Sequence, residues 1–352
     1  MPNCPINSPG GDHTIQTTGR ITSNRQFYDA GFPSIEPLDA RQTALVREFN
    51  AKIESGDIPL EHVPCLCGAE EFSRIADFDR YRIKQTTVIC NACGLIQSMP
   101  RMTAEATRWF YGSDYYRLLY DPEILHLDRD TFDGVIARSA YRYEHIKEHV
   151  GSASIDTVLE VGCGGGWNLY PFFKEGKTVV GYDFSPALVR FGRSLGLDLR
   201  VGSAAEIEGE EFDLIILSHI VEHFLDPVGE VRKITDHLSA SGVLYIEVPN
   251  ADQFCLGGLQ NAHTYFFSPR TLAHYMGRAG LAPRMMARFG PHIGGIFERS
   301  EAAASHDLGS EFAAMRDIVR AHERREAAKD LLKSLGVFSL AKSAISLIRR
   351  VR

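Results

Sequence analysis

A glycine-rich turn at residues 160–167, Glu-Val-Gly-Cys-Gly-Gly-Gly-Trp, joins a predicted strand to a predicted helix. Around it, short apolar runs alternate with segments of helical spacing, which is typical of parallel strands joined by right-handed crossover helices. Two runs on either side of Gly290 and Pro291 predict an antiparallel hairpin that closes the sheet. We therefore predict an α/β fold. The predicted strands are 157–161, 177–183, 197–201, 212–218, 243–248, 284–289 and 293–299.

The composition of the turn favours a cationic, nucleotide-like ligand. Glycines let the backbone approach a ligand because they lack Cβ, and the Glu160 carboxylate can bind an ammonium group. A dinucleotide fingerprint would place its third glycine at position 167, where the bulk of Trp167 would obstruct helix packing. NAD is therefore the weaker interpretation, and S-adenosylmethionine, which carries an ammonium and a sulfonium, is the stronger one. A tight turn without a ligand is the structural alternative.

Residues 154–299 resemble the class I S-adenosylmethionine-dependent methyltransferases, which have a seven-stranded Rossmann-like sheet. The family pattern of an acid followed by Gly-x-Gly-x-Gly matches Glu160 and the glycines after it. The resemblance implies that Asp183 binds the ribose hydroxyls and that Phe184 packs against the adenine. As an alternative, Asp183 only caps the helix that follows it. The implied cofactor residues are Glu160, Gly162, Gly164, Gly166, Asp183 and Phe184, with Ser203 and Ala204 at the adenine edge and Ser218 and His219 at the methionine portion.

Four cysteines in two pairs predict a small zinc-binding unit, and the short runs 81–83 and 86–89 between the cysteine turns predict strands. Cys65-x-Cys67-Gly68 and Cys90-x-x-Cys93-Gly94 have the spacing of ligands that enclose a tetrahedral Zn²⁺, and closed four-sulfur sites are usually structural. The first pair is one residue shorter than the common knuckle, so His62 is an alternative ligand. A set of buried free thiols is the other alternative. We assign no chemistry to the remaining cysteines, Cys4, Cys163 and Cys255.

The segments around the cysteines indicate which methyltransferases the chain resembles most. The pattern Cys93-Gly94-Leu95-x-Gln97, followed by tyrosine-rich helices, resembles the sugar methyltransferases of antibiotic and surface-polysaccharide pathways. In the deoxysugar C-methyltransferases among them, a Glu-His pair precedes a Ser/Thr-aromatic-Phe-Ser stretch, and the His is the base. Here Ala262 replaces the Glu, His263 is kept, and the segment after residue 299 is short for the additional C-terminal domain of those enzymes. We therefore expect O-methylation rather than C-methylation.

Three residues are candidates for the chemistry: His263, His219 and Glu222. A sugar hydroxyl is too weak an acid to ionise at neutral pH, so a neutral imidazole that takes its proton during attack is the simplest base, and His263 is the first choice. His219 and His223 flank Glu222 at the carboxyl edge of the predicted sheet, where open α/β folds bind ligands. We expect His219 to orient a substrate and Glu222 to orient a histidine ring. The alternatives are a metal held by His219 and His223, and a loop position without function for His263.

The composition predicts a globular chain built from several segments. Of the 352 residues, 44% are hydrophobic and 24% are charged, and no apolar stretch is long enough for a transmembrane helix. The first 19 residues lack the pattern of a secretion signal and predict a flexible arm, and the few cysteines outside the cluster predict a cytoplasmic protein. The predicted segments are a flexible arm and helix (1–60), the zinc-binding unit (61–100), a helical bridge or lid (101–150), the S-adenosylmethionine-binding domain (151–300) and a helical basic tail (301–352).

The distribution of charge bears on the partners. The chain has 38 Lys and Arg against 45 Asp and Glu, so its acidic body argues against a nucleic-acid partner and hence against an RNA methyltransferase. Basic residues gather after Arg320, and from Val337 onward they occupy one face of a predicted amphipathic helix. Such a helix predicts peripheral contact with the inner face of a membrane, or packing against the body of the same chain or against a second copy. The expected acceptor is a sugar nucleotide or a glycan, and a non-catalytic glycan-assembly protein is the rival from another class.

Overall fold

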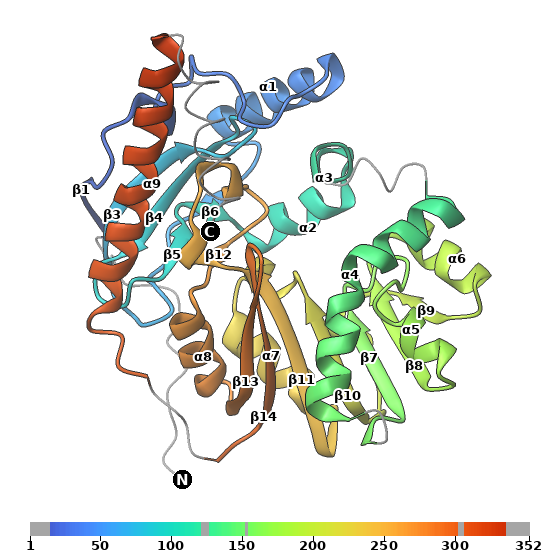
Figure 1. The fold of residues 1–352 in the computed structure, drawn as a ribbon. Coiled ribbons are helices and arrows are strands. Elements are labelled where there is room, and N and C mark those ends of the chain that lie inside the picture. Colours follow the sequence, from blue (N-terminus) through green and yellow to red (C-terminus); the bar gives the residue numbers. More distant parts are fainter. Residues whose placement is uncertain (1–14, 121–126, 152–153, 302–305, 336–352) are drawn as a thin grey trace, which may run out of the picture.

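A mixed seven-stranded sheet forms the centre of the computed structural model, which describes residues 15–120, 127–151, 154–301 and 306–335 (Figure 1). The strand order is β13-β14-β11-β10-β7-β8-β9, with β7 to β11 parallel and β14 antiparallel to β11. The predicted α/β fold with a seven-stranded sheet is therefore confirmed. The strands are β7 (Thr157–Val161), β8 (Thr178–Asp183), β9 (Asp198–Val201), β10 (Phe212–Ser218), β11 (Leu238–Pro249), β13 (Leu281–Phe289) and β14 (His292–Arg299).

Helices cover both faces of this sheet, which explains why its strands are continuous apolar runs. In β10, Leu214 and Ile216 belong to the core under α4, α5 and α6, whereas Ile215 and Leu217 belong to the core under α7 and α8. Successive side chains of a strand point to opposite faces, so both sets must be apolar. The helices are α4 (Arg129–Val150), α5 (Tyr170–Lys174), α6 (Pro186–Ser194), α7 (Pro227–Thr235) and α8 (Pro269–Arg278).

A second sheet contains the cysteine turns and has the order β1-β3-β4-β5-β12. Its last strand comes from the segment around His263, far away in the sequence, and pairs with β5 through Tyr265 and Phe266. Ser98 at the end of β5 also donates a hydrogen bond from its backbone N–H to the carbonyl of Thr264 (3.0 Å). The strands are β1 (Gln16–Arg20), β3 (Glu71–Phe78), β4 (Lys84–Cys90), β5 (Ile96–Ser98) and β12 (Tyr265–Phe266), and a separate small ladder joins β2 (Leu60–Glu61) to β6 (Arg101–Met102).

Two local predictions in the N-terminal part are wrong. Residues 16–19, predicted as part of a flexible arm, belong to β1, because they pair in parallel with β3 and the Thr18 hydroxyl donates to the carbonyl of Phe72 (3.1 Å). Residues 81–83, predicted as strand, form the turn between β3 and β4, where Arg82 has a positive φ of 69°. The strand β3 was missed in the sequence, since its charged residues interrupt the alternation of apolar side chains.

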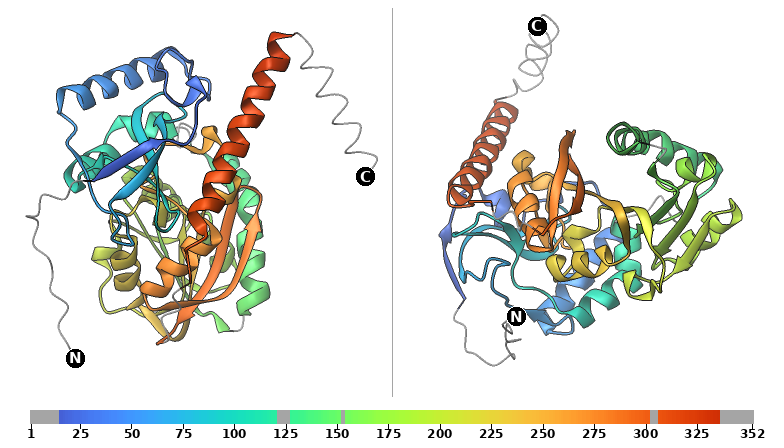
Figure 2. Two further views of the ribbon diagram at one scale, coloured as in Figure 1. Left: turned by 90° about the vertical axis from the view of Figure 1, so that its left-hand side faces the viewer. Right: turned by 90° about the horizontal axis from the view of Figure 1, so that it is seen from below.

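The remaining helices flank the two sheets. α1 (Ala40–Ser55), α2 (Ala104–Gly112) and α3 (Asp114–Tyr120) pack together through aromatic side chains, among them Phe49 and Tyr115, whose ring centroids are 5.3 Å apart. α9 (Glu311–Ser334) packs along the N-terminal sheet, at the opposite end of the molecule from α6 (Figure 2). The amphipathic helix predicted from Val337 lies outside the described residues. Within the part of the chain that the structure describes, no helix is long and apolar enough to cross a membrane.

Candidate cofactor and active site

The glycine-rich loop after β7 adopts a conformation that only glycine accommodates. Gly162, Gly164 and Gly166 have φ values of 71°, 55° and 84°, in the left-handed region. A Cβ on Gly162 would lie 2.1 Å from the Ile220 side chain, and one on Gly164 would lie 2.2 Å from the ring of Trp167. The loop is therefore tightly packed on its inner side, and Trp167 occupies the place of the third glycine of a dinucleotide fingerprint.

Glu160 lies buried beneath this loop with one oxygen unused. Its Oε1 accepts a hydrogen bond from Asn168 Nδ2 (2.7 Å), whereas Oε2 has no hydrogen-bond partner among the residues that the structure describes. Burial raises the pKa of Glu160 to about 8. An orphaned carboxylate oxygen in a buried position calls for a cationic partner, so the residues present fit the ammonium group of S-adenosylmethionine.

Asp183 connects the loop to the next helix. Its Oδ2 accepts a hydrogen bond from the backbone N–H of Gly164 (2.9 Å), and its Oδ1 accepts one from that of Ser185 (2.7 Å). Phe184 is 66% exposed, and Val201, which pairs with Asp183 across β8 and β9, is 50% exposed. Two exposed apolar side chains beside a carboxylate fit a nucleoside, with the base against the apolar surface. Val201 was not anticipated from the sequence.

The other predicted cofactor residues also lie at the carboxyl edge of the sheet. Ser203 and Ala204 follow β9, and the Ser203 hydroxyl is engaged by the Glu206 carboxylate (2.6 Å) in a capping box. The side chain of Ser203 therefore stabilises its own turn, and its predicted contact with adenine stays a prediction. Ser218 is the last residue of β10, and His219 follows it directly.

Glu222 is the centre of a cluster of three histidines. It lies in the short 3-10 helix η5 (Val221–His223), and its Oε1 is 3.3 Å from His219 Nδ1, 4.0 Å from His223 Nε2 and 3.9 Å from His263 Nε2. The side chain is almost fully buried, at 1% exposure, and neither oxygen has a hydrogen bond within the described residues. The structure thus places His219 and His263 around the Glu222 carboxylate, so the three predicted catalytic residues lie in one cluster.

A second buried carboxylate, Glu247 in β11, was missed in the sequence. It accepts hydrogen bonds from the hydroxyls of Tyr141 and Tyr245 and from Arg142 Nη2, each at 2.7 Å. Its Oε1 also lies 3.2 Å from His219 Nε2 and 3.5 Å from His292 Nδ1. The only signal in the sequence was a charged residue within an otherwise apolar run, and most of its partners could not be inferred because they come from α4, β14 and the segment after β10.

The histidines near the two carboxylates differ in the direction in which their pKa is shifted. Burial lowers the pKa of His219, but the nearby carboxylates of Glu222 and Glu247 outweigh burial and raise it to about 9. Burial lowers the pKa of His263 well below its ordinary value, and burial with the nearby His219 lowers that of His292 to about 4. Near neutral pH, His219 is therefore a cation, whereas His263 and His292 are neutral and able to accept a proton.

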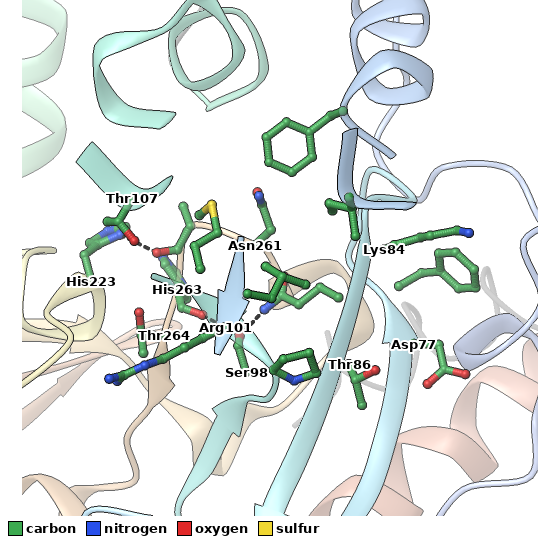
Figure 3. Close-up of a pocket in the computed structure, with 18 of the residues that line it drawn as sticks. Asp77, Lys84, Thr86, Ser98, Arg101, Thr107, His223, Asn261, His263 and Thr264 are labelled. Atoms are coloured by element: carbon green, nitrogen blue, oxygen red, sulfur yellow. Dashed lines mark hydrogen bonds between the residues drawn. The ribbon is translucent and has the colours of Figure 1, made fainter. Parts of the chain in front are cut away.

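His263 is held from several sides at the end of a cavity (Figure 3). The Ser98 hydroxyl donates to the His263 carbonyl (2.8 Å), the Gln260 amide contacts the ring, and the His223 ring lies across it with centroids 4.9 Å apart. Tyr111 places its hydroxyl 2.6 Å from His223 Nδ1. With an exposure of 4%, His263 is buried rather than exposed to solvent.

The four cysteines converge as predicted. Sγ atoms of Cys65 and Cys93 are 3.5 Å apart, those of Cys67 and Cys90 are 3.6 Å apart, and all four lie within 4.8 Å of one another. Four Zn–S bonds of about 2.3 Å in a tetrahedron place the sulfurs roughly 3.8 Å apart. The set therefore fits a zinc ion without His62, which does not belong to the cluster.

Comparison with known proteins defines the class. Residues 138–284 match a family model described as a methyltransferase domain. This match shows a methyltransferase domain within residues 138–284, and the seven-stranded sheet and the glycine loop are typical of the class I S-adenosylmethionine-dependent methyltransferases. The cysteine turns and α1 to α3 lie outside the matched region.

Particular relatives share the domain at low identity. Ubiquinone biosynthesis O-methyltransferase of Chelativorans sp. (strain BNC1) is 27% identical over 170 residues, which cover 45% of this chain and 63% of that protein. The protein of the same name from Bordetella avium (strain 197N) is 26% identical over 211 residues, 53% of this chain and 81% of that protein. With the first of these, the similarity thus spans less than two thirds of the relative's length. A solved structure, the 1,6-didemethyltoxoflavin-N1-methyltransferase of Burkholderia thailandensis, aligns with a TM-score of 0.45 and 17% identity over 62% of this chain and 96% of that one.

Proposed function

We propose that the chain is an S-adenosylmethionine-dependent O-methyltransferase that methylates a sugar hydroxyl. The observation that carries the proposal is His263, a buried neutral imidazole that lines a cavity and lies 3.9 Å from Glu222. When bound, S-adenosylmethionine supplies a methyl group on a sulfonium, which is already activated for in-line displacement. The protein must then align the acceptor and remove its proton.

Each side chain of the site has a defined task in this proposal. Glu160 binds the ammonium group through its unused oxygen, and Asp183 binds the ribose hydroxyls. His263 takes the hydroxyl proton on its ring while the acceptor oxygen attacks, and the Glu222 carboxylate stabilises the imidazolium that results. His219, a cation between Glu222 and Glu247, positions the two carboxylates and contacts the methionine portion.

A phenolic hydroxyl is the second candidate acceptor. The low pKa of His263 makes its ring a weak base, and a weak base works best on a hydroxyl that is itself more acidic. A phenol, with a pKa of about 10, meets this condition better than a sugar hydroxyl. The curated relatives, whose names describe O-methyltransferases, support oxygen as the atom methylated in either case.

The test of the proposed function is turnover of S-adenosylmethionine with a panel of glycosides, glycans and phenols. We expect formation of S-adenosylhomocysteine and a product that is heavier by one CH₂, with an O-methyl signal in its NMR spectrum. A C-methyl signal would establish the C-methyltransferase alternative. Turnover with RNA alone would establish the RNA methyltransferase, and binding of S-adenosylhomocysteine without turnover on any acceptor would support a non-catalytic role.

We further propose that the four-cysteine cluster holds a structural zinc ion. Turns that end in Gly68 and Gly94 carry the two pairs, and a Cβ on Gly94 would lie 2.6 Å from the backbone of Glu311 at the start of α9. The cluster therefore fixes a turn against which another element packs. Such a site contributes folding energy to a small unit and has no expected contact with the methyl group.

Purified protein is expected to contain about one zinc per chain, and Cys67→Ser should lose it and lower the melting temperature. The reason is that a closed four-sulfur site loses its geometry with any one ligand. Plasma emission spectrometry and thermal unfolding measure the two effects. Cys255→Ser, which changes an exposed cysteine outside the cluster, serves as the control. Less than half an equivalent of zinc in the unmodified protein would contradict the proposal.

A further inference from the structure

The cavity beside His263 is built largely by residues that precede the methyltransferase domain. It has a volume of about 340 Å³, which is in the range of small-molecule sites. His223 and His263 lie at one end, and Asp77 and Lys84 lie toward the other, on the N-terminal sheet (Figure 3). The apolar part of the wall comes from α1, β3 and the β2–β6 ladder and includes Phe49, Ile53, Leu60, Phe78 and Met102.

Every cation in the wall of the cavity is already neutralised. Arg74 forms an ion pair with Asp77, Lys84 pairs with Glu54, and Arg101 pairs with Glu61 (2.9 Å). Binding a diphosphate would require these carboxylates to be displaced, because two negative charges need cations that are not engaged elsewhere. The cavity is therefore poorly suited to a sugar nucleotide.

Outside the ion pairs, Gln85 offers a buried polar atom of the wall that a ligand can satisfy. Gln85 is 8% exposed, and its Nε2 contacts the Ser98 hydroxyl, while its Oε1 has no hydrogen-bond partner among the described residues. An unpaired buried carbonyl is costly unless a donor reaches it. A hydroxyl of a ligand would be such a donor, and Ser98 connects this group directly to the loop of His263.

We propose that this cavity binds the body of the methyl acceptor, and that the acceptor is an uncharged amphipathic molecule in which a hydroxyl-bearing ring carries an apolar substituent. The proposal rests on the proposed function and narrows its substrate class to alkyl or aryl glycosides and alkylated phenols. The ring meets His263 and Gln85, and the apolar substituent lies against the aromatic and aliphatic wall. Selectivity for the acceptor then resides largely in residues before 138, outside the region that matches the family model.

Binding of defined probes to the full-length protein with S-adenosylhomocysteine tests the proposal. The probes are hexyl β-D-glucopyranoside and 4-hexylcatechol. Glucose, catechol and UDP-glucose are the compounds with which they are compared. We expect at least one hexyl probe to bind about tenfold or more tightly than its unsubstituted ring and than UDP-glucose, as measured by calorimetry. The hexyl probe that binds more tightly shows whether the natural acceptor is a glycoside or a phenol. Tighter binding of UDP-glucose, or no binding of either hexyl probe, would overturn the proposal.

Variants locate the binding in the cavity. Thr107→Trp fills it from α2 and should weaken the hexyl probe about tenfold or more, whereas Arg108→Trp, on the exposed side of the same helix, should leave it unchanged. Gln85→Leu removes the unpaired carbonyl and should also weaken binding, which provides a second variant if Thr107→Trp does not fold. Probe binding that neither variant weakens would place the acceptor elsewhere. Probe binding without methyl transfer would refute the proposed function and leave the cavity assignment standing.

Discussion

Replacement of His263 by alanine is expected to lower turnover by about 10²-fold or more while leaving the affinity for S-adenosylhomocysteine unchanged. The variant removes the neutral imidazole that faces the acceptor cavity, but it touches neither the glycine loop nor Asp183. Steady-state kinetics on the best acceptor measure the first effect, and calorimetry measures the second. If the turnover of His263→Ala stays within a few-fold of that of the unmodified protein, another group is the base, and the neutral His292 is the next candidate.

The pH profile and two further variants separate catalysis from folding. His263→Asn keeps a polar side chain in the buried position and should be as inactive as His263→Ala, whereas His274→Ala on α8 should retain full turnover. Since the pKa of His263 lies well below its ordinary value, the base is neutral above that pKa. Turnover should therefore be constant near neutral pH and fall only in acid. A rise that is complete only near pH 9 would instead point to His219, whose pKa is about 9.

Asp183→Ala is expected to lower the affinity for S-adenosylhomocysteine by about 10²-fold or more, because hydrogen bonds to a charged group contribute about 1.5–3 kcal/mol each. The carboxylate would bind the ribose hydroxyls, and it also holds Gly164 and Ser185 in place through their backbone N–H groups. Calorimetric titration measures the affinity. The loop and the helix start would loosen together, so the melting temperature should fall as well.

Two controls define what the loss means. Asp183→Asn keeps one acceptor oxygen and should lose less affinity than Asp183→Ala. Asp198→Asn, at the other end of the neighbouring strand and paired with Arg200 (2.8 Å), should bind as the unmodified protein does. If Asp183→Ala lowers the melting temperature but not the affinity, the residue is only a helix cap and the alternative stated from the sequence is correct.

The central sheet could be predicted because its strands carry their own signal. Strands such as β7 and β10 are buried on both faces, so each is a continuous apolar run with bounds that the sequence gives correctly. By contrast, β1 and β12 exist only because a partner strand lies beside them, and β12 has two residues. Pairing with a distant segment leaves no periodic trace in so short a stretch, and so the second sheet was missed as a sheet.

In the candidate site, too, residues of a local sequence pattern could be predicted, whereas residues brought together by the tertiary structure could not. The glycine loop, Glu160 and Asp183 form a local pattern, so the sequence alone is enough to predict them as cofactor residues. Glu247 and His292 belong to the site only because β11 and β14 lie side by side, with Glu247 facing Gly294 in the register. Contacts of this kind depend on the tertiary arrangement, which no spacing along the chain encodes. His263 was predicted as the base from the family resemblance and from the chemistry of imidazole, whereas its burial and its lowered pKa are visible only in the structure.

The two-residue strand β12 makes the N-terminal part of the chain indispensable to the rest. A truncated protein that began after β5 would expose the pairing edge of Tyr265 and Phe266 and release the carbonyls of His263 and Thr264 from Ser98. The loop of His263 would then lose these hydrogen bonds, and the cavity beside it would lose the wall that the N-terminal segments provide. A different N-terminal segment fused to this domain would have to provide a strand that pairs with β12 as β5 does, with a serine at its end in the place of Ser98.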